Sequence, residues 1–512
     1  MKKSMFKNKI LSLNDLNKKI IKEKLRKRKI VLCHGVFDLL HLGHIKHFKE
    51  ARSYGDILVV TVTPDQYVNK GPNRPAFKIK DRLEALAALE FIDYVAENNW
   101  STAINTIKFL KPHIYCKGPD YKDQSKDLTK NIKKEENAVK LVKGKIRYTD
   151  DVTFSSSNIL NKFGNIFNNN QISLIKKLNI KYNFEIIKKM IEDLKKLNVL
   201  LIGESIIDQY VFCEALGKSG KEPVLVMRDL ETQQYAGGAL AIAKHLSNFC
   251  NSVTLLSVLG QKKEYEKFAK QNLSKNIKTY FLYKKGSPTI IKKRYVDHIN
   301  NNKILGVYSI NDEKLDNNNE KKLEILLKKL SSKNDLTIVS DFGHGFISKK
   351  IAKKIPNVAK FTSLNAQINA ANIGYHTMEN YRNIDCTIIN ENELRHQLRD
   401  KDGSLISLMK NLATKLKTNN VVVTQGSLGA TLYDKKTKKT FKCPAFASKI
   451  IDKIGSGDAM LALLSLCLKK GYDKNFSLFI GSLAAAQSVE TIGNSKPVNK
   501  VKMLKTIEHL LK

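Results

Sequence analysis

Residues 30–48 constrain the fold more than any other stretch of this chain. An apolar run that begins at Ile30 ends at Gly35, and a segment with helical spacing begins near His41. A strand that passes through a glycine turn into a helix directs backbone N–H groups and the positive end of the helix dipole at a ligand. His41 and His44 lie three residues apart and so share one helix face. The stretch therefore predicts a phosphate site with two imidazole donors.

Strands and helices are expected to alternate along the rest of the chain. Strands are predicted over 56–63, 92–95 and 113–116, helices over 79–90 and 101–110, and a further strand over 197–203 begins a second series. This alternation is typical of doubly wound parallel sheets, in which ligands bind at the carboxyl ends of the strands. We therefore predict the α/β class with two doubly wound domains.

Size and charge limit the class of protein. A chain of 512 residues is too long for one typical core, so two or three domains are expected. The net charge of +40 comes mostly from lysines spread along the whole chain, which we interpret as a solvated surface rather than a specific nucleic-acid site. No run of about 18 apolar residues and no signal-peptide core is present, so neither a membrane partner nor export is expected.

The cysteines favour a reducing compartment. Seven cysteines are scattered without a CxxC pair, so the spacing supports neither a zinc site nor a disulfide framework. We therefore expect a cytoplasmic protein, with small molecules as its partners.

The string Gly35-x-Phe37-Asp38-x-x-His41-x-Gly43-His44 resembles the signature of the HxGH nucleotidyltransferases, which include cytidylyltransferases and sugar-phosphate adenylyltransferases. Further pieces of the family pattern follow in order over about 130 residues, which makes coincidence a poor explanation. The resemblance implies catalytic roles for His41 and His44. It implies nucleotide or phosphate binding by Gly35, Phe37, Asp38, Gly43, Lys70, Arg74, Arg82, Lys117, Gly118, Asp120, Ser155, Ser156 and Ser157.

Two details of this half bear on the nucleotide. Lys117-Gly-x-Asp120-Tyr121 is more similar to the adenylyltransferase of ADP-heptose synthesis than to cytidylyltransferases. The arginine that cytidylyltransferases carry before the serine motif is replaced by Asp150. Both details favour ATP over CTP, and CTP stays open as an alternative.

The second half resembles the ribokinase-like (PfkB) carbohydrate kinases. Its strongest piece is Gly455-Ser-Gly457-Asp458, where the glycines would form an anion hole and Asp458 would take the proton from a sugar hydroxyl. The resemblance implies ATP or phosphate binding by Asn390, Glu393, Thr424, Gly426, Gly429, Gly455 and Gly457, and sugar binding by Asp208, Gly237, Gly238, Lys292 and Arg294. Magnesium would be held through Glu393 and the nucleotide phosphates, with no direct protein metal ligand and with ATP as substrate.

Some sugar-recognition positions depart from the kinase pattern. Ala241 replaces the asparagine of a Gly-Gly-x-x-Asn motif, an arginine expected near 306–307 is absent, and the 341–345 stretch has His344 instead of a lysine. The catalytic turn is intact. The sugar therefore stays open, and a silent kinase domain is an alternative.

These resemblances predict a lead-in helix over 1–28, a nucleotidyltransferase domain over 29–163, a linker over 164–194 and a kinase domain over 195–512. Bifunctional heptose enzymes join the same two activities, usually with the kinase first. The expected function has two steps. A heptose 7-phosphate-like sugar is phosphorylated at C1, and AMP is then transferred to the new 1-phosphate. The products are pyrophosphate and an ADP-sugar for surface polysaccharide. A homodimer is consistent with the kinase family, and a basic nucleic-acid-binding protein is the alternative of another class.

Overall fold

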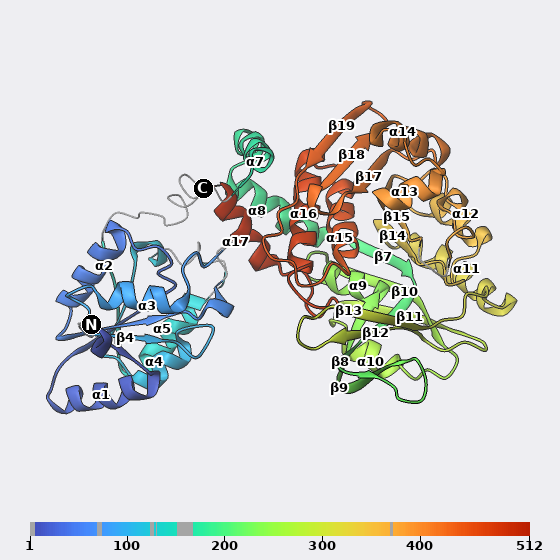
Figure 1. The fold of residues 1–512 in the computed structure, drawn as a ribbon. Helices are drawn as coiled ribbons and strands as arrows, with labels where there is room; N and C mark the ends of the chain where they lie inside the picture. Colours follow the sequence, from blue (N-terminus) through green and yellow to red (C-terminus); the bar gives the residue numbers. More distant parts are fainter. Residues whose placement is uncertain are drawn as a thin grey trace. The chain divides into compact units, whose positions relative to one another are not determined.

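The computed structural model describes residues 6–68, 74–122, 127, 129, 131–150, 167–368 and 372–511. Contacts between Cα atoms divide the chain into unit 1, residues 1–168 with 501–512, and unit 2, residues 169–500 (Figure 1). The ends of these units differ from the predicted domain boundaries, which stay predictions.

Unit 1 is built on one parallel sheet of six strands in the order β1-β4-β3-β2-β5-β6. The strands are β1 (Ile10–Leu11), β2 (Ile30–Gly35), β3 (Ile57–Val62), β4 (Tyr94–Glu97), β5 (Ile114–Lys117) and β6 (Lys145–Tyr148). The strand residues are almost entirely apolar and buried in β2 and β3, as expected for a parallel sheet that is covered on both faces.

Helices cover both faces of this sheet. Residues of α2 (Leu42–Ser53) and α3 (Ile79–Ala87) share one core with Val31, Cys33 and Val60. Residues of α1 (Leu13–Leu25), α4 (Ile104–Leu110) and α5 (Asn131–Leu141) share the other core with the alternate strand residues, which lie on the opposite face of the sheet. Side chains of a strand alternate between faces, so β2 contributes to both cores.

Unit 2 has a main sheet of nine strands in the order β11-β10-β7-β14-β15-β16-β17-β18-β19, in which only the pairs β17–β18 and β18–β19 are antiparallel. Its strands are β7 (Asn198–Gly203), β10 (Ser252–Gly260), β11 (Ile277–Lys284), β14 (Leu336–Asp341), β15 (Thr362–Ala366), β16 (Cys386–Asn390), β17 (Asn420–Thr424), β18 (Ala430–Asp434) and β19 (Lys439–Cys443).

Two groups of helices flank the main sheet. One group is α9 (Ala239–Ser247), α15 (Ser456–Lys469) and α16 (Lys474–Ser488), and the other is α11 (Asn317–Ser331), α12 (Lys349–Val358), α13 (Glu391–Leu398) and α14 (Leu405–Lys415) (Figure 1). The short helix α10 (Glu266–Gln271) precedes β11, and α17 (Lys500–Leu511) ends the described chain. This double covering confirms the predicted doubly wound α/β class.

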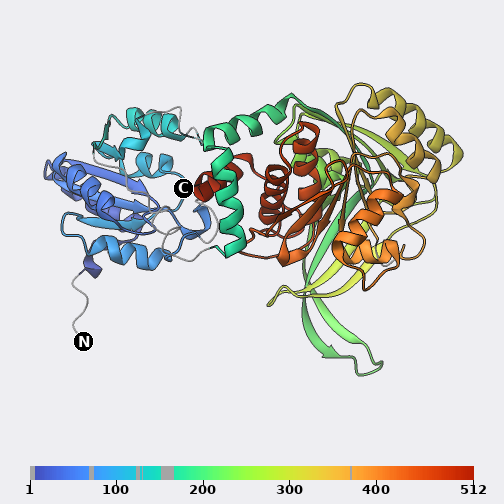
Figure 2. The same ribbon diagram turned by 90° about the horizontal axis from the view of Figure 1, so that it is seen from above.

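A smaller sheet of four strands, β13-β12-β8-β9, belongs to the same unit. It contains β8 (Ser205–Lys218), β9 (Leu225–Gly238), β12 (Ile290–Asp297) and β13 (Lys303–Ser309). Figure 2 shows the long β8–β9 hairpin extending away from the body of unit 2. Residues of β12 alternate between buried and half-buried, so Lys292 and Arg294 lie on its buried face.

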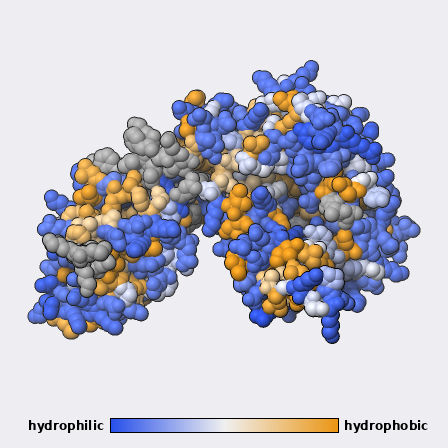
Figure 3. Space-filling model, viewed as in Figure 1, coloured by the Kyte–Doolittle hydropathy of each residue, from blue (hydrophilic) through white to orange (hydrophobic). Residues whose placement is uncertain are grey.

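The stretch interpreted as a linker is largely helical. Helices α7 (Asn169–Lys181) and α8 (Phe184–Asp193) belong to unit 2, where Gln171 donates to the Ala445 carbonyl and Lys470 pairs with Asp193. Hydrophilic residues cover most of the visible face in Figure 3, as the dispersed lysines predicted.

Candidate active sites

The histidine pair of unit 1 lies where β2 gives way to α2. His41 is the N-cap residue of α2, and His44 lies in its first turn with its N–H donated to the His41 carbonyl. The two imidazole rings stack with centroids 3.9 Å apart, and the Phe37 ring meets His44 edge-on at 5.5 Å. A Cβ at Gly35 would lie 2.7 Å from the Phe37 ring, so glycine makes this turn possible. The predicted motif is thus assembled at a helix N-terminus, with Gly43 in the same turn.

Asp38 holds the segment that precedes α3 against the turn that contains His41 and His44. Its buried carboxylate accepts from Arg74 Nη1 at 2.9 Å and from the Phe77 N–H at 3.0 Å. The Arg74 side chain is also buried, yet its Nε and Nη2 have no hydrogen-bond partner within the described part of the chain. A buried guanidinium with unused donors is suited to an anionic oxygen.

Arg82 is held in place by hydrogen bonds from its buried guanidinium. Its fully buried guanidinium donates to the carbonyls of Val36, Thr63 and Phe77 and to the Asp65 carboxylate, at 2.5 to 3.1 Å. These bonds tie the ends of two strands to α3. The geometry supports a structural role, and its predicted phosphate contact stays a prediction.

Lys117 ends β5 as a buried residue, 3.1 Å from the Glu135 carboxylate of α5 and 4.4 Å above the Tyr121 ring. Burial opposes its charge, but Tyr115, Tyr121 and Glu135 together raise the pKa of Lys117 well above its usual value. Gly118 follows, and apart from its chain neighbours no atom of the described residues lies within 4 Å of a Cβ built on it. Lys70, Ser155, Ser156 and Ser157 lie outside the described residues, as does the side chain of Asp120.

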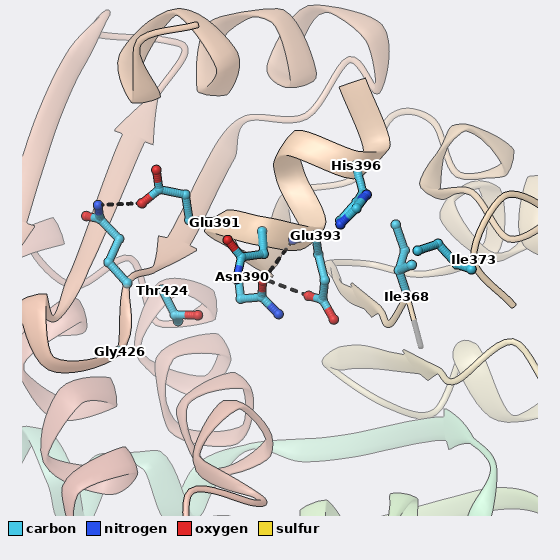
Figure 4. A pocket seen from close by; sticks show the side chains of 10 residues that line it. Ile368, Ile373, Asn390, Glu391, Glu393, His396, Thr424 and Gly426 are labelled. Atoms are coloured by element: carbon cyan, nitrogen blue, oxygen red, sulfur yellow. Dashed lines mark hydrogen bonds between the residues drawn. The ribbon is translucent and has the colours of Figure 1, made fainter. Parts of the chain in front are cut away.

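A cavity of about 600 Å³ opens in unit 2 at the carboxyl ends of β16 and β17. The predicted ATP residues Asn390, Glu393, Thr424 and Gly426 line it, together with Ile368, Ile373 and His396 (Figure 4). Gly429, also predicted to bind ATP, does not line the cavity. A Cβ at this position would overlap with the Cys443 carbonyl, so a glycine is needed for the chain to enter β18 from the turn.

Asn390 and Glu393 form a reciprocal cap at the start of α13. The Asn390 side chain accepts from the Glu393 N–H at 2.8 Å, and the Glu393 carboxylate accepts from the Asn390 N–H at 3.2 Å (Figure 4). Burial raises the pKa of Glu393 to about 7. The cap therefore fixes a carboxylate at the cavity wall.

A second group of predicted residues gathers where the small sheet meets α15. Asp208 accepts from Arg294 Nη1 at 2.5 Å, and a Cβ at Gly237 would overlap with its Oδ2. Lys292 is buried, which lowers its pKa, and it interacts electrostatically with Asp208 and Asp458. Burial raises the pKa of Asp458 to about 7, with Asp208 adding to the shift and Lys292 opposing it. The structure thus brings the predicted base and sugar ligands together.

The glycine turn before Asp458 is a helix N-terminus with room above it. Gly455 is the N-cap of α15 with φ of +86°, and a Cβ there would overlap with the Asn494 side chain. Apart from its two chain neighbours and the nearby backbone of α15, no atom of the described residues lies within 4 Å of a Cβ built on Gly457. Asp452 anchors the turn by accepting from Tyr210 Oη at 2.6 Å and Lys303 Nζ at 2.5 Å. Such an open, positively polarised helix start binds anions.

Comparison with known families identifies the family of the half that holds this site. The family model described as pfkB family carbohydrate kinase matches residues 196–501. The chain belongs to the pfkB family. The glycine turn and the cavity-lining Asn390 and Glu393 lie within this matched region. A ribokinase structure from Thermotoga maritima aligns over 61% of this chain and 99% of that chain, at 17% identity and a TM-score of 0.48.

A second family model, described as cytidylyltransferase-like, matches residues 32–173, nearly all of which lie in unit 1. The predicted order, nucleotidyltransferase-like half before pfkB half, is confirmed by these two matches. Among curated relatives, the bifunctional protein HldE of Aliarcobacter butzleri is 44% identical over 23% of this chain and 25% of its own length. The HldE protein of Campylobacter fetus is 39% identical over 31% of this chain and 32% of its own length. The matches thus span about a quarter to a third of these relatives.

Sequence reasoning missed a buried polar group at the ends of β7 and β14 in the pfkB half. Glu204 accepts from the N–H groups of Phe342 and His344, and Tyr381 Oη donates to Asp341 at 2.6 Å. Burial raises the pKa of Asp341 to about 6. Only the position of acidic residues directly after apolar strands could have indicated it.

Among the described residues, no helix is long and apolar enough to cross a bilayer.

Proposed function

We propose that this chain activates a sugar in two steps. The pfkB half transfers a phosphoryl group from ATP to C1 of a heptose 7-phosphate-like sugar. The nucleotidyltransferase-like half then joins the new 1-phosphate to AMP from a second ATP and releases pyrophosphate. The product is an ADP-sugar. The observation that carries this proposal is that one chain holds both the stacked pair His41–His44 and the base Asp458, each at a helix N-terminus.

In the first step, Asp458 accepts the proton of the attacking sugar hydroxyl. A pKa near 7 suits a general base at neutral pH. Backbone N–H groups at the start of α15, next to Gly457, stabilise the transferring phosphoryl. The Arg294–Asp208 pair and Lys292 offer opposite charges to the hydroxyl and phosphate groups of the sugar.

Magnesium fits the donor set of the ATP cavity. Mg²⁺ prefers oxygen ligands and is commonly held by one or two carboxylates, waters and substrate phosphates. Glu393 offers a carboxylate at the cavity wall, and Asn390 fixes its position. Glu393 would hold the ion through water, and the ion would neutralise charge on the ATP phosphates.

In the second step, the sugar 1-phosphate is itself the nucleophile and needs no strong base. His41 and His44 donate hydrogen bonds to the α-phosphate of ATP and to the departing pyrophosphate. The unused donors of Arg74 supply further positive charge beside the same turn. Lys70 and the serines Ser155, Ser156 and Ser157 would complete the phosphate site.

The test is product analysis by mass spectrometry. The full chain receives magnesium, equal ATP and CTP, and D-glycero-D-manno-heptose 7-phosphate. We expect an ADP-heptose phosphate and pyrophosphate. Asp458→Asn should stop the reaction at the unmodified sugar phosphate, and His44→Asn should let the heptose bisphosphate accumulate.

Other outcomes would separate the alternatives. A CDP-sugar would contradict the choice of ATP. Product from supplied sugar 1-phosphates alone would mean a silent kinase half or one that uses another sugar. Loss of both steps in either single variant would contradict two separate sites.

Compartment and assembly complete the proposal. All seven cysteines are buried and unbridged, which supports a reducing compartment such as the cytoplasm. A homodimer stays a prediction, and its measurement is the mass of the native chain in solution.

A further inference from the structure

Three potential metal ligands meet behind the histidine turn of unit 1, and the two proposed reactions use none of them. Cys33 and Cys116 are register partners on the adjacent strands β2 and β5. His47 comes from α2, which covers the same face of the sheet. One ligand atom from each residue lies within 4.8 Å of the other two. Within the described ranges, no other group of three or more cysteine, histidine or acidic residues meets this criterion.

The surroundings fix the cluster. Both cysteines are fully buried, and His47 is half-buried. The hydroxyl of Thr149, a fully buried residue directly after β6, lies 2.9 Å from Nδ1 of His47. A hydrogen bond from the second coordination sphere to an imidazole is the usual way in which proteins orient a histidine ligand. Thr149 therefore acts as a positioning residue for the ring.

We propose that Cys33, Cys116 and His47 bind one thiophilic divalent cation of the Zn²⁺ type. Two thiolates and an imidazole are soft donors that select Zn²⁺ over Mg²⁺ or Ca²⁺. The three ligand atoms lie close enough together that small side-chain movements would bring all three onto one cation, and a water molecule would take the fourth position. This site is distinct from the magnesium that would serve ATP in unit 2.

Charge balance favours this occupant. Binding replaces the two S–H protons by two S–metal bonds and releases both protons to solvent. A divalent cation and two thiolates form a neutral unit, which is the state that a buried site tolerates best.

Occupancy would tie β2, β5 and α2 together. His47 lies one helical turn beyond His44, and Cys33 lies two residues before Gly35. The cation would thus brace the wall behind the proposed nucleotidyl-transfer site. It need not take part in the reaction, so this inference does not depend on the proposed function.

The test uses the reduced full chain and Cd²⁺, whose bonds to sulfur give an ultraviolet charge-transfer absorption. We expect the absorption to saturate at one Cd²⁺ per chain and Zn²⁺ to reverse it. Cys33→Ser should abolish the absorption. His47→Gln, at a half-buried position that tolerates substitution better, should weaken Cd²⁺ binding at least about tenfold, and so should Thr149→Val.

The matched control is Cys386→Ser, which removes a fully buried thiol from the parallel strand β16 of unit 2. It should bind Cd²⁺ as the wild type does. Circular dichroism confirms that each variant is folded. The proposal is overturned if the wild type shows no sulfur-to-cadmium absorption, or if Cys33→Ser and His47→Gln both retain it at wild-type strength.

Discussion

The phosphoryl-transfer step should depend on pH through Asp458, and two neighbours should move that dependence in opposite directions. Burial and the Asp208 carboxylate raise the pKa of Asp458 to about 7, and Lys292 lowers it. Only the deprotonated carboxylate can accept the proton of the sugar hydroxyl. The kinase rate should therefore rise with pH through neutrality.

The expected size follows from the fraction of the base that is deprotonated. With a pKa of about 7, the deprotonated fraction is about 0.1 at one pH unit below the pKa and about 0.9 at one pH unit above it. The kinase rate should then change about tenfold across that range. Lys292→Met removes a stabilising positive charge and should move the midpoint up by roughly one pH unit. Asp208→Asn removes a repelling negative charge and should move it down.

The assay is the initial rate of ADP release at saturating sugar, measured across pH for wild type and both variants. Substrate phosphates also titrate near neutrality, with a second pKa of about 6, so a single profile is ambiguous. A shift of the midpoint between variants is unambiguous, because a mutation in the protein leaves the ionisation of the free substrates unchanged. Identical midpoints in all three proteins, or shifts of reversed sign, would refute Asp458 as the base.

Three further results are expected. Gly237→Ala pushes a methyl group into the Asp208 carboxylate and should lower kinase activity about 10²-fold by misplacing the sugar, with sugar 1-phosphate adenylylation unchanged in the same preparation. Arg82→Ala leaves the carbonyls that accept from its guanidinium without a donor, so the free energy of unfolding in urea should fall by about 3–5 kcal/mol. A fall of less than about 1 kcal/mol would argue against a structural role for Arg82. Because the pKa of Asp341 is raised from 3.8 to about 6 in the folded protein, the folded state holds this proton more tightly, and the free energy of unfolding should fall as pH rises between those values. Asp341→Asn should therefore be more stable than wild type at about pH 8 but not at about pH 4.

Strands and helices of unit 1 were predictable because their periodicity is a local property. The strand expected over 56–63 is β3, and the helix expected over 79–90 is α3 with an earlier end. The apolar character of buried parallel strands is carried by each strand alone. By contrast, no element was predicted between residues 122 and 150, where α5 and β6 form, because their lysine-rich sequence hides the apolar positions.

The candidate sites were predictable where a short motif contains the whole arrangement. His41 and His44 need only one helix turn between them, and the Asn390–Glu393 cap needs three residues. The Cys33–His47–Cys116 cluster could not be predicted from cysteine spacing, because its ligands come from two strands and a helix that only the folded sheet brings together. Sequence spacing identifies metal sites when the ligands share a loop, which is not the arrangement here.

The glycines of unit 2 show why a motif does not by itself assign a role. Gly429 and Gly455 both have positive φ, and side chains would overlap with neighbouring atoms at both positions, so both are required by backbone geometry. Gly457 has neither constraint: it lies in the first turn of α15 with open space beside it. A residue without a side chain in open space at a helix N-terminus is what close approach of a phosphoryl group requires. Gly457→Ala should therefore fold normally and lose kinase rate, whereas Gly455→Ala should lose stability first, and urea unfolding beside the ADP-release assay separates the two effects.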